Sequence, residues 1–423
     1  MKAAALLLTL LGLASCAVPP PTDPNQPQPA PAPAAEPAAP APAPLPPPPP
    51  PPPPLPPLLP HAEAVVNAAN LLFEKANLGD QDNKSARRMV LIDPLIDGVT
   101  RQQTKATAAM ESRIVALAKS SYPKFDVKPF NAVNLAQSPL LVVGTFTPIN
   151  QQGKSEGDRE SYRFCLVMVD LKSGKLVSKA VMRSRMDNVD AAPLPFFADA
   201  PGWSRDPAAE GYVKTCQASK PGDAIQPSYV EALVASSLID EGIRAYNARR
   251  YREALVLFTK AQASSGGQQL RVLTGLYLTH IKLGMRDAAA KSFGQLVDYG
   301  IAQGMLAMQF TFANGASVLP ADTVSTPYGM WLRTIAKKLN DQKLCAEVGG
   351  HASHGGPEAV NDRLSSLRAE YVRQRLLDEA PTLTKRLIAA GYGSRANLVG
   401  TGRDDASDQL DRRVELKLLA CGT

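Results

Sequence analysis

The chain reads GHASHGG at residues 350–356, NDRLSSLRA at residues 361–369 and DRRVE at residues 411–415. The first block is rich in glycine and histidine, which is typical of a loop, and the second has helical spacing. Its Asn361, its first serine, Ser365, and its last arginine, Arg368, are placed at i, i+4 and i+7, so they lie along one stripe of a helix. The three blocks therefore predict one site that is built from a loop, a helix and a later segment.

In this order and at this spacing, the blocks resemble the OmpA-like peptidoglycan-binding domain, whose pattern runs GHTDxxG, NxxLSxxRA and NRRVE. The resemblance covers residues 303–423 and implies an α+β domain, a βαβα core with further strands. It also implies a ligand, because the pocket of this family takes the diaminopimelate of a peptidoglycan stem peptide. That side chain ends in both an ammonium and a carboxylate group.

Carried over by position, Arg368 matches the arginine that pairs with the ligand carboxylate, and Asn361 matches the asparagine beside it. Arg413 is a further candidate for the pocket. The aspartate that accepts from the ammonium falls on Ser353, which brings a hydroxyl but no charge. Losing a charge-assisted hydrogen bond removes about 1.5–3 kcal/mol of binding free energy. The alternative for Arg368 is an ion pair on the surface of the helix.

Other polar residues of this region have simpler interpretations. His351, His354 and the nearby Cys345 suggest a metal site, but a lone HxxH in a glycine loop is a weak signal, and we expect neither a metal nor a cofactor. The alternative for His351 is a framework residue. We expect a solvated loop at Arg403, Asp404, Asp405 and Asp408, and a solvent-facing side chain at Arg412.

The secondary structure expected in residues 303–423 follows from the same pattern. We expect Asn361 to be the N-cap of the second helix, since an asparagine side chain can accept an amide hydrogen of the first turn. We expect strands at 305–312, 345–348, 397–400 and 413–419, and a first helix at 326–340.

The start of the chain indicates its compartment. Residues 1–15 hold Lys2, a short apolar run and small residues before Cys16, as in a secretory signal peptide. The sequence Leu-Ala-Ser-Cys resembles the bacterial lipobox, which implies acylation of Cys16, and Ala17 implies an outer-membrane location facing the periplasm. The alternative is an ordinary secretory signal with an incidental cysteine.

Residues 16–61 form a linker. Residues 19–60 contain 24 of the 39 prolines of the chain, a composition that cannot bury a core and favours polyproline II. We interpret the linker as a spacer that reaches up to about 130 Å from the membrane, at roughly 3.1 Å per residue. The alternative is a docking site for a domain that reads PxxP motifs.

Residues 62–225 predict an α+β domain, which resembles small domains of other envelope lipoproteins. Asp93 and Asp97 could form a carboxylate pair for acid–base chemistry, but aspartates at strand ends are more often turn or cap residues. We expect helices at 62–77 and 101–120, and strands at 89–93, 140–144, 163–170 and 175–182.

Residues 226–302 predict all-α hairpins with a repeat. Ala254 and Phe258 recur thirty-five residues later as Ala289 and Phe293, and Gly242 is a further small residue. A period near 34 resembles the tetratricopeptide repeat. Two repeats are fewer than are needed to stand alone, so we expect them to pack on a neighbouring domain. They serve either as a docking groove for a protein or as a structural connector.

Four cysteines remain once Cys16 is set aside. Their proximity in sequence favours disulfides between Cys165 and Cys216 and between Cys345 and Cys421, which a periplasmic location permits. Four buried free thiols are the alternative.

Charge and motif content narrow the function. The net charge of +7 is not gathered into basic clusters with interleaved aromatics, so we expect no nucleic-acid partner. No catalytic motif is present, and we expect no enzyme activity, with a wall hydrolase as the less favoured class. The sequence predicts a multidomain lipoprotein that tethers the outer membrane to peptidoglycan and recruits an envelope protein through residues 62–300. The alternative is a scaffold or activator that has lost wall binding through Ser353.

Overall fold

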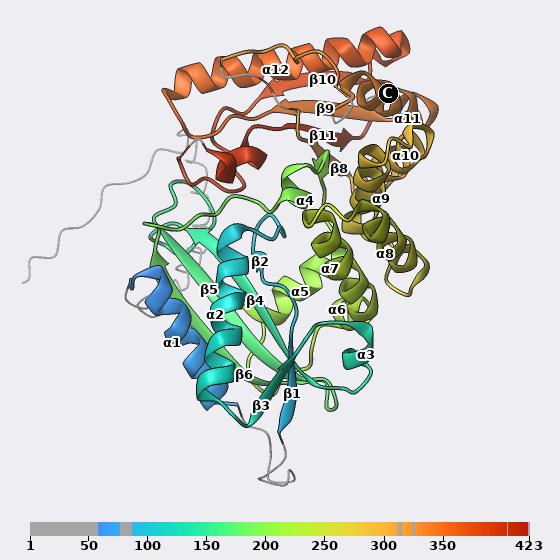
Figure 1. Cartoon of the computed structure of the whole chain (residues 1–423). Helices are drawn as coiled ribbons and strands as arrows, with labels where there is room; N and C mark the ends of the chain where they lie inside the picture. Colours follow the sequence, from blue (N-terminus) through green and yellow to red (C-terminus); the bar gives the residue numbers. More distant parts are fainter. Residues whose placement is uncertain are drawn as a thin grey trace, which may run out of the picture. The chain divides into compact units, whose positions relative to one another are not determined.

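The computed structural model describes residues 58–76, 87–310, 312, 315–323, 326–403 and 405–421. The predicted signal peptide, Cys16 and almost all of the proline-rich linker lie outside these ranges. The described chain contains an α+β sheet region, a stretch of paired helices and a second α+β sheet region (Figure 1). Within these ranges, helices are either too short or too polar to cross a membrane.

The first sheet has the strand order β3-β1-β4-β5-β6, with β2 paired to β4. The parallel pairs are β1 with β3, β1 with β4, and β2 with β4. The antiparallel pairs are β4 with β5 and β5 with β6. The strands are β1 Arg88–Ile92, β2 Ile96–Asp97, β3 Phe125–Lys128, β4 Leu140–Ile149, β5 Ser161–Asp170 and β6 Lys175–Arg185.

Both faces of the central strands are buried, because apolar residues continue through β4 and most of β5 without alternation, whereas the edge strand β6 alternates. Leu140 and Val142 point to one core, and Leu141 and Val143 point to the other, as the two-residue period of a strand requires. Helices from the same stretch cover the two faces. The first core takes α1 His61–Glu74 and α2 Lys105–Ser121, and the second takes α3 Ala132–Leu135, α5 Pro207–Gln217 and α6 Pro227–Val230.

The paired helices are α7 Leu233–Asn247, α8 Tyr251–Ala263, α9 Leu270–Lys282 and α10 Arg286–Ala302, preceded by the short α4 Pro195–Ala198. Phe258 of α8 fills the space between α7 and α9. A Cβ atom on Gly242 would lie 2.9 Å from the Phe258 ring, and one on Gly275 would lie 2.5 Å from it. The helices can therefore approach only because both positions are glycine.

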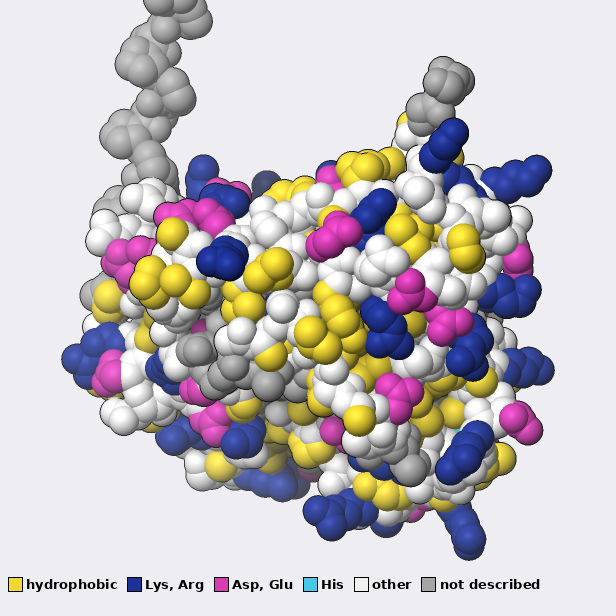
Figure 2. Space-filling model, turned by 90° about the horizontal axis from the view of Figure 1, so that it is seen from above, with side chains coloured by type: hydrophobic (Ala, Val, Ile, Leu, Met, Phe, Trp, Pro, Cys, Tyr) yellow, Lys and Arg dark blue, Asp and Glu magenta, His cyan; other side chains and the backbone are white. Residues whose placement is uncertain are grey.

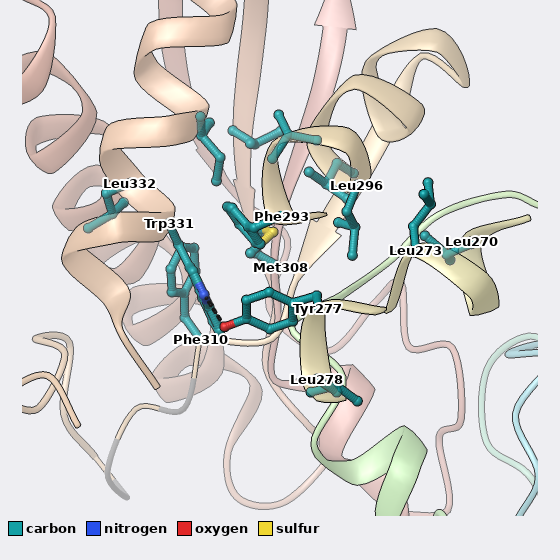
Figure 3. Packing of buried hydrophobic residues seen from close by; sticks show 14 of the residues in the cluster. Leu270, Leu273, Tyr277, Leu278, Phe293, Leu296, Met308, Phe310, Trp331 and Leu332 are labelled. Atoms are coloured by element: carbon teal, nitrogen blue, oxygen red, sulfur yellow. Dashed lines mark hydrogen bonds between the residues drawn. The ribbon is translucent and has the colours of Figure 1, made fainter. Parts of the chain in front are cut away.

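The second hairpin packs directly on the C-terminal region. Phe293 of α10 stacks on Trp331 with ring centroids 5.7 Å apart, and the Trp331 Nε1–H donates to the Tyr277 hydroxyl at 2.7 Å (Figure 3). Phe310 and Met308 join the same cluster. One continuous hydrophobic core thus serves both the paired helices and the C-terminal sheet. The expectation that two repeats would need a neighbour agrees with this packing.

The C-terminal sheet has the order β10-β9-β11-β8-β7, in which β9 and β10 are parallel and the other pairs antiparallel. Strand β7 comes from residues predicted to belong to the first domain. The elements are β7 Gly202–Trp203, β8 Met305–Met308, α11 Tyr328–Asp341, β9 Cys345–Gly350, α12 Glu358–Glu379, η1 Pro381–Leu383, β10 Leu387–Gly391, η2 Ala406–Asp411 and β11 Val414–Leu419.

Three local predictions in this region are wrong. Strand β8 ends at Met308 rather than at residue 312, and the third strand lies at Leu387–Gly391 rather than at 397–400. Asn361 is not an N-cap, because α12 begins at Glu358 with Pro357 before it. Pro357 occupies the N-cap position with an extended backbone, so the helix begins three residues before Asn361.

Two disulfides are present. Cys165 of β5 is bonded to Cys216 of α5, and Cys345 of β9 is bonded to Cys421, with Cα–Cα distances of 6.0 and 5.2 Å. These are the pairings that proximity in sequence favoured, and the alternative of four free thiols is wrong. On the face seen in Figure 2, Lys and Arg side chains are spread mostly around the outline, with hydrophobic side chains between them.

Candidate functional site

The first motif block forms the loop that leaves β9. Its backbone is held on both sides, because the His351 N–H donates to the Arg413 carbonyl at 3.0 Å and the Ala352 N–H donates to the Gly393 carbonyl at 2.8 Å. Gly350 is required by close packing, since a Cβ atom there would lie 2.0 Å from the Ser365 carbonyl oxygen. The loop is therefore fixed between the sheet and α12.

The second block places its polar stripe on the buried side of α12. Asn361, Ser365 and Arg368 are all buried. The Asn361 Nδ2–H donates to the Gly355 carbonyl at 3.1 Å, and the Ser365 hydroxyl accepts from the Gly393 N–H at 2.9 Å. The helix and the glycine loop are thus joined directly, as the spacing of the motifs predicts.

Arg368 is 4% exposed and is covered by the segment that follows β8. Its Nε–H donates to the Ala316 carbonyl at 3.0 Å, and its guanidinium carbon lies 4.8 Å from the centre of the Phe312 ring. A planar guanidinium stacked on an aromatic ring keeps a fixed orientation. The Arg368 side chain is therefore enclosed within the domain.

Ser353 lies in the same loop and is 6% exposed. The position that carries an acid in the OmpA-like pattern is therefore buried and uncharged in this chain. The next residue, His354, is exposed, and its Nε2 lies 3.2 Å from a carboxylate oxygen of Asp158. Asp158 comes from the loop between β4 and β5, far away in sequence, and no sequence motif marked it.

Arg413 is fully occupied by its own surroundings. It donates to the Glu415 carboxylate at 3.1 Å and to the Ala396 carbonyl at 3.3 Å, and a longer bond reaches the Leu410 carbonyl. Its observed contacts organise the loop before η2. His351 lies beside it, stacked on Tyr392 at 5.1 Å. Burial, together with the smaller effect of the Arg413 charge, lowers the pKa of His351 to about 3, so His351 is neutral near pH 7.

The expected solvated loop at 403–408 is partly wrong. Asp408 is completely buried, and its carboxylate accepts from the Thr401 N–H at 2.9 Å and from its hydroxyl at 2.6 Å. Arg403 donates to the Val189 carbonyl at 2.5 Å. Arg412 is half-buried rather than fully facing solvent, and it donates to the Asp405 carbonyl at 3.0 Å, while Asp404 lies outside the described residues.

Asp411, which was not among the predicted site residues, organises the preceding turn. Its carboxylate accepts from the N–H groups of Leu398, Val399 and Gly400 at 2.6–2.9 Å. Burial raises the pKa of this carboxyl to about 6. The signal that could have found it is the first residue of the DRRVE block, where the OmpA-like pattern has asparagine.

Asp93 and Asp97, the two aspartates considered for acid–base chemistry, have different hydrogen-bond partners. Asp97 accepts from the N–H groups of Val99 and Thr100 at 2.8 and 2.7 Å, which is the behaviour of a turn residue. Asp93 is buried and accepts a hydrogen bond from the Tyr229 hydroxyl. Burial raises the pKa of Asp93 to about 7. Across the described ranges, His, Cys, Asp and Glu side chains form no group of three that could hold a metal ion.

Comparisons with known proteins agree with the C-terminal fold. Residues 311–410 match the OmpA family. A stretch of 74 residues is 36% identical to outer membrane porin F of Pseudomonas fluorescens, and this stretch is 18% of the chain and 22% of that protein. The chain thus spans about a fifth of the length of this curated relative.

Several solved structures resemble the same region. The periplasmic domain of MotB from Helicobacter pylori is 16% identical, covering 28% of this chain and 76% of that one, with a TM-score of 0.24. The peptidoglycan-associated lipoprotein from Burkholderia pseudomallei is 23% identical, covering 27% and 89%, with a TM-score of 0.22. The cell wall anchor of the type VI secretion system from Pseudomonas aeruginosa is 22% identical, covering 27% and 80%, with a TM-score of 0.23. The C-terminal region of this chain carries an OmpA-like domain.

Proposed function

We propose that this protein is a non-enzymatic outer-membrane lipoprotein that tethers the membrane to peptidoglycan. The observation that carries the proposal is the junction of the glycine loop with α12, where the Asn361 side chain donates to Gly355 and Arg368 lies buried in the same helix. An arginine with a fixed guanidinium can hold a carboxylate by two parallel hydrogen bonds. The ligand is the diaminopimelate of a stem peptide.

A sacculus pull-down of the full chain in detergent tests this proposal. We expect retention of the wild-type protein, weaker retention of Arg368→Ala and stronger retention of Ser353→Asp, which restores a carboxylate at the ammonium position. Arg375→Ala, a change of the same kind further along α12, is the matched control. Equal retention of Arg368→Ala and Arg375→Ala would argue against the pocket.

A second function is favoured by two observations. The acid position holds Ser353, and the Nε–H of Arg368 is already used by the Ala316 carbonyl. Both fit an envelope scaffold or activator whose OmpA-like domain no longer binds the wall. Absence of the wild-type protein from washed sacculi, with Ser353→Asp retained, would select this function.

The lipid anchor is tested at Cys16. We expect mass spectrometry of the N-terminal peptide to find acyl chains on this cysteine, and Cys16→Ser to release the protein from the membrane fraction, because multiple acyl chains give stable anchoring. An unmodified Cys16 in a membrane-bound protein would contradict the anchor.

Recruitment of an envelope protein is assigned to residues 62–300. Val234 of α7 and Val256 of α8 are 50% and 53% exposed, which gives the paired helices apolar side chains on their surface. We expect a photo-crosslinker at residue 256 to capture one envelope protein. The same crosslinker at Val133 of α3, which is also exposed, is the control for non-specific capture.

A further inference from the structure

A pocket of about 370 Å³ lies where the β4–β5 loop meets two loops of the C-terminal domain. We call it the loop pocket. Of the charged or titratable residues that line it, His354 alone belongs to one of the three motif blocks, and Arg368 does not line it. Its volume lies in the range of small-ligand sites. The charged side chains that line it are Glu156, Asp158, Arg159, His354, Glu358 and Arg395.

The β4–β5 loop is a built structure that is held in place. Asn150 organises it by donating from Nδ2 to the Glu156 carbonyl and by accepting from the Lys154 N–H, both at 2.9 Å. Arg159 is buried, and its guanidinium donates to the Asn397 carbonyl of the C-terminal domain at 3.1 Å. The opposing Asp158–His354 contact measures 3.2 Å. The wall of the pocket therefore has a defined position.

Arg159 also carries an unused donor. It is 7% exposed, and its Nε–H is buried without a hydrogen-bond partner in the described part of the chain. A buried polar group without a partner costs free energy. A cationic group held in this way at a pocket wall favours a ligand that brings an acceptor, since a small shift of the side chain would satisfy it.

Charges of both signs face this pocket from different elements. Glu156 and Asp158 bring carboxylates from the N-terminal sheet region, and Asp158 is 77% exposed at its side chain, so it remains open to a ligand. Arg395 brings a guanidinium from the opposite side, where its Nη1 contacts the Asp362 carboxylate and, at 3.4 Å, the Glu358 carboxylate. Because exposed ion pairs of this kind contribute little, Arg395 can exchange these contacts for a ligand carboxylate.

We propose that the loop pocket binds an amino-acid head group that carries both an ammonium and a carboxylate. Glu156 and Asp158 accept from the ammonium, and Arg395 donates to the carboxylate. The wall peptide is taken as the source of this head group, and in that choice alone the inference rests on the proposed function. The pocket places carboxylates next to the loop in which Ser353 lacks one.

The test is calorimetric titration of the full chain in detergent with two tripeptides that differ only at one end. One ends its side chain in the ammonium and carboxylate of diaminopimelate, and the other has lysine, which lacks the carboxylate. We expect Glu156→Gln/Asp158→Asn to weaken binding of the diaminopimelate peptide about tenfold, as for loss of a charge-assisted bond. Free diaminopimelate as a third probe tells a peptide source from a free amino acid.

Arg395→Gln separates the two ends of the ligand. This variant should lower the affinity for the diaminopimelate peptide about tenfold and leave the affinity for the lysine peptide unchanged. Only the diaminopimelate side chain carries the carboxylate that Arg395 would bind. Glu160→Gln, an exposed acid of the same loop that does not line the pocket, is the matched control and should change neither affinity. Unfolding midpoints of all variants establish that they fold.

Each other outcome overturns the inference. Unchanged affinity in both pocket variants places the peptide elsewhere, and if Arg368→Ala then abolishes binding, the proposed function stands without the loop pocket. Tighter peptide binding by Glu156→Gln/Asp158→Asn would mean that the β4–β5 loop hinders access of the peptide to the site at Arg368. No binding of any probe by the wild-type chain removes the loop pocket as a site, while sacculus retention still decides the proposed function.

Discussion

Both faces of the N-terminal sheet are covered by helices from the same stretch of chain, whereas the C-terminal sheet shares its hydrophobic core with helices α7–α10. The difference lies in where the large aromatic residues are buried. Phe125 and Phe146 remain within the first region, but Trp331 packs on Phe293 and Tyr277 of the paired helices. An OmpA-like sequence pattern can thus occur in a domain whose stability depends on its neighbour.

The largest expected effect comes from Trp331→Ala. Removal of a buried tryptophan typically costs about 3–5 kcal/mol, and here the Tyr277 hydroxyl also loses its donor. Hydrogen exchange should accelerate together in α9, α10 and β9, with the N-terminal sheet unchanged. Phe125→Ala should give the opposite distribution, and acceleration confined to α11 in the first variant would show two separate cores.

Removal of the disulfides compares the two regions at their covalent links. By chain entropy, loops of 51 and 76 residues give similar stabilisation, about 2–4 kcal/mol each. We expect Cys165→Ala/Cys216→Ala to cost more than Cys345→Ala/Cys421→Ala, because the first pair lies inside a core and Cys421 is exposed. Urea unfolding followed region by region measures both. A larger cost for the second pair would mean that loop closure outweighs burial.

Acidification provides a smaller probe of the C-terminal region. Burial holds the pKa of His351 at about 3, so between pH 6.5 and 3 the unfolded chain binds more protons and the folded state loses stability as the pH falls. The contribution is roughly 2 kcal/mol between pH 6.5 and 5. The raised pKa of Asp411 acts in the opposite direction, since burial makes that carboxyl easier to protonate in the folded state.

The variant His351→Phe isolates the histidine contribution, because it keeps a ring that can stack on Tyr392. We expect the stability of this variant, measured by urea unfolding of the C-terminal sheet at each pH, to fall less on acidification than that of the wild type. Identical slopes would mean that His351 is protonated in the folded protein.

The smallest expected effects distinguish two helical glycines. Gly242→Ala should destabilise the paired helices by about 1 kcal/mol, because the added methyl group meets the Phe258 ring. Gly294→Ala should stabilise them by about 0.5–1 kcal/mol, because its nearest neighbours are 3.9 Å away and alanine favours a helix. Thermal unfolding of the two variants gives the signs. Equal signs would contradict the close packing at Gly242.

Local patterns predicted the elements that bury their own residues. The hairpin β5–β6, the helix α11 and the buried stripe of α12 could be read from the spacing of apolar and polar residues. The strand expected at 397–400 does not form, and the reason is physical. The backbone N–H groups of Leu398 and Val399 donate to the Asp411 carboxylate rather than to a neighbouring strand. Asp411 lies about a dozen residues later in the chain, and the periodicity of apolar residues does not predict such a contact.

The candidate site was predictable only in its motif residues. The neighbours that define its chemistry come from segments without a motif, namely the Ala316 carbonyl that covers Arg368 and the Asp158 carboxylate beside His354. Contacts of this kind depend on how separate regions meet, and composition and spacing carry no information about that. The functional roles given to Ser353, Asn361, Arg368 and Arg413 remain predictions.

The two residues of β7 have a practical consequence. Gly202 and Trp203 pair with Met308 and Ala307, so the outer side of β8 is completed by a segment located about a hundred residues earlier. A fragment cut at residue 303 would leave that strand with unpaired backbone groups and would uncover the apolar surface of Trp331. Unprotected strand edges of this type promote aggregation. Non-specific adsorption of such a fragment to a large insoluble particle could then be mistaken for specific binding.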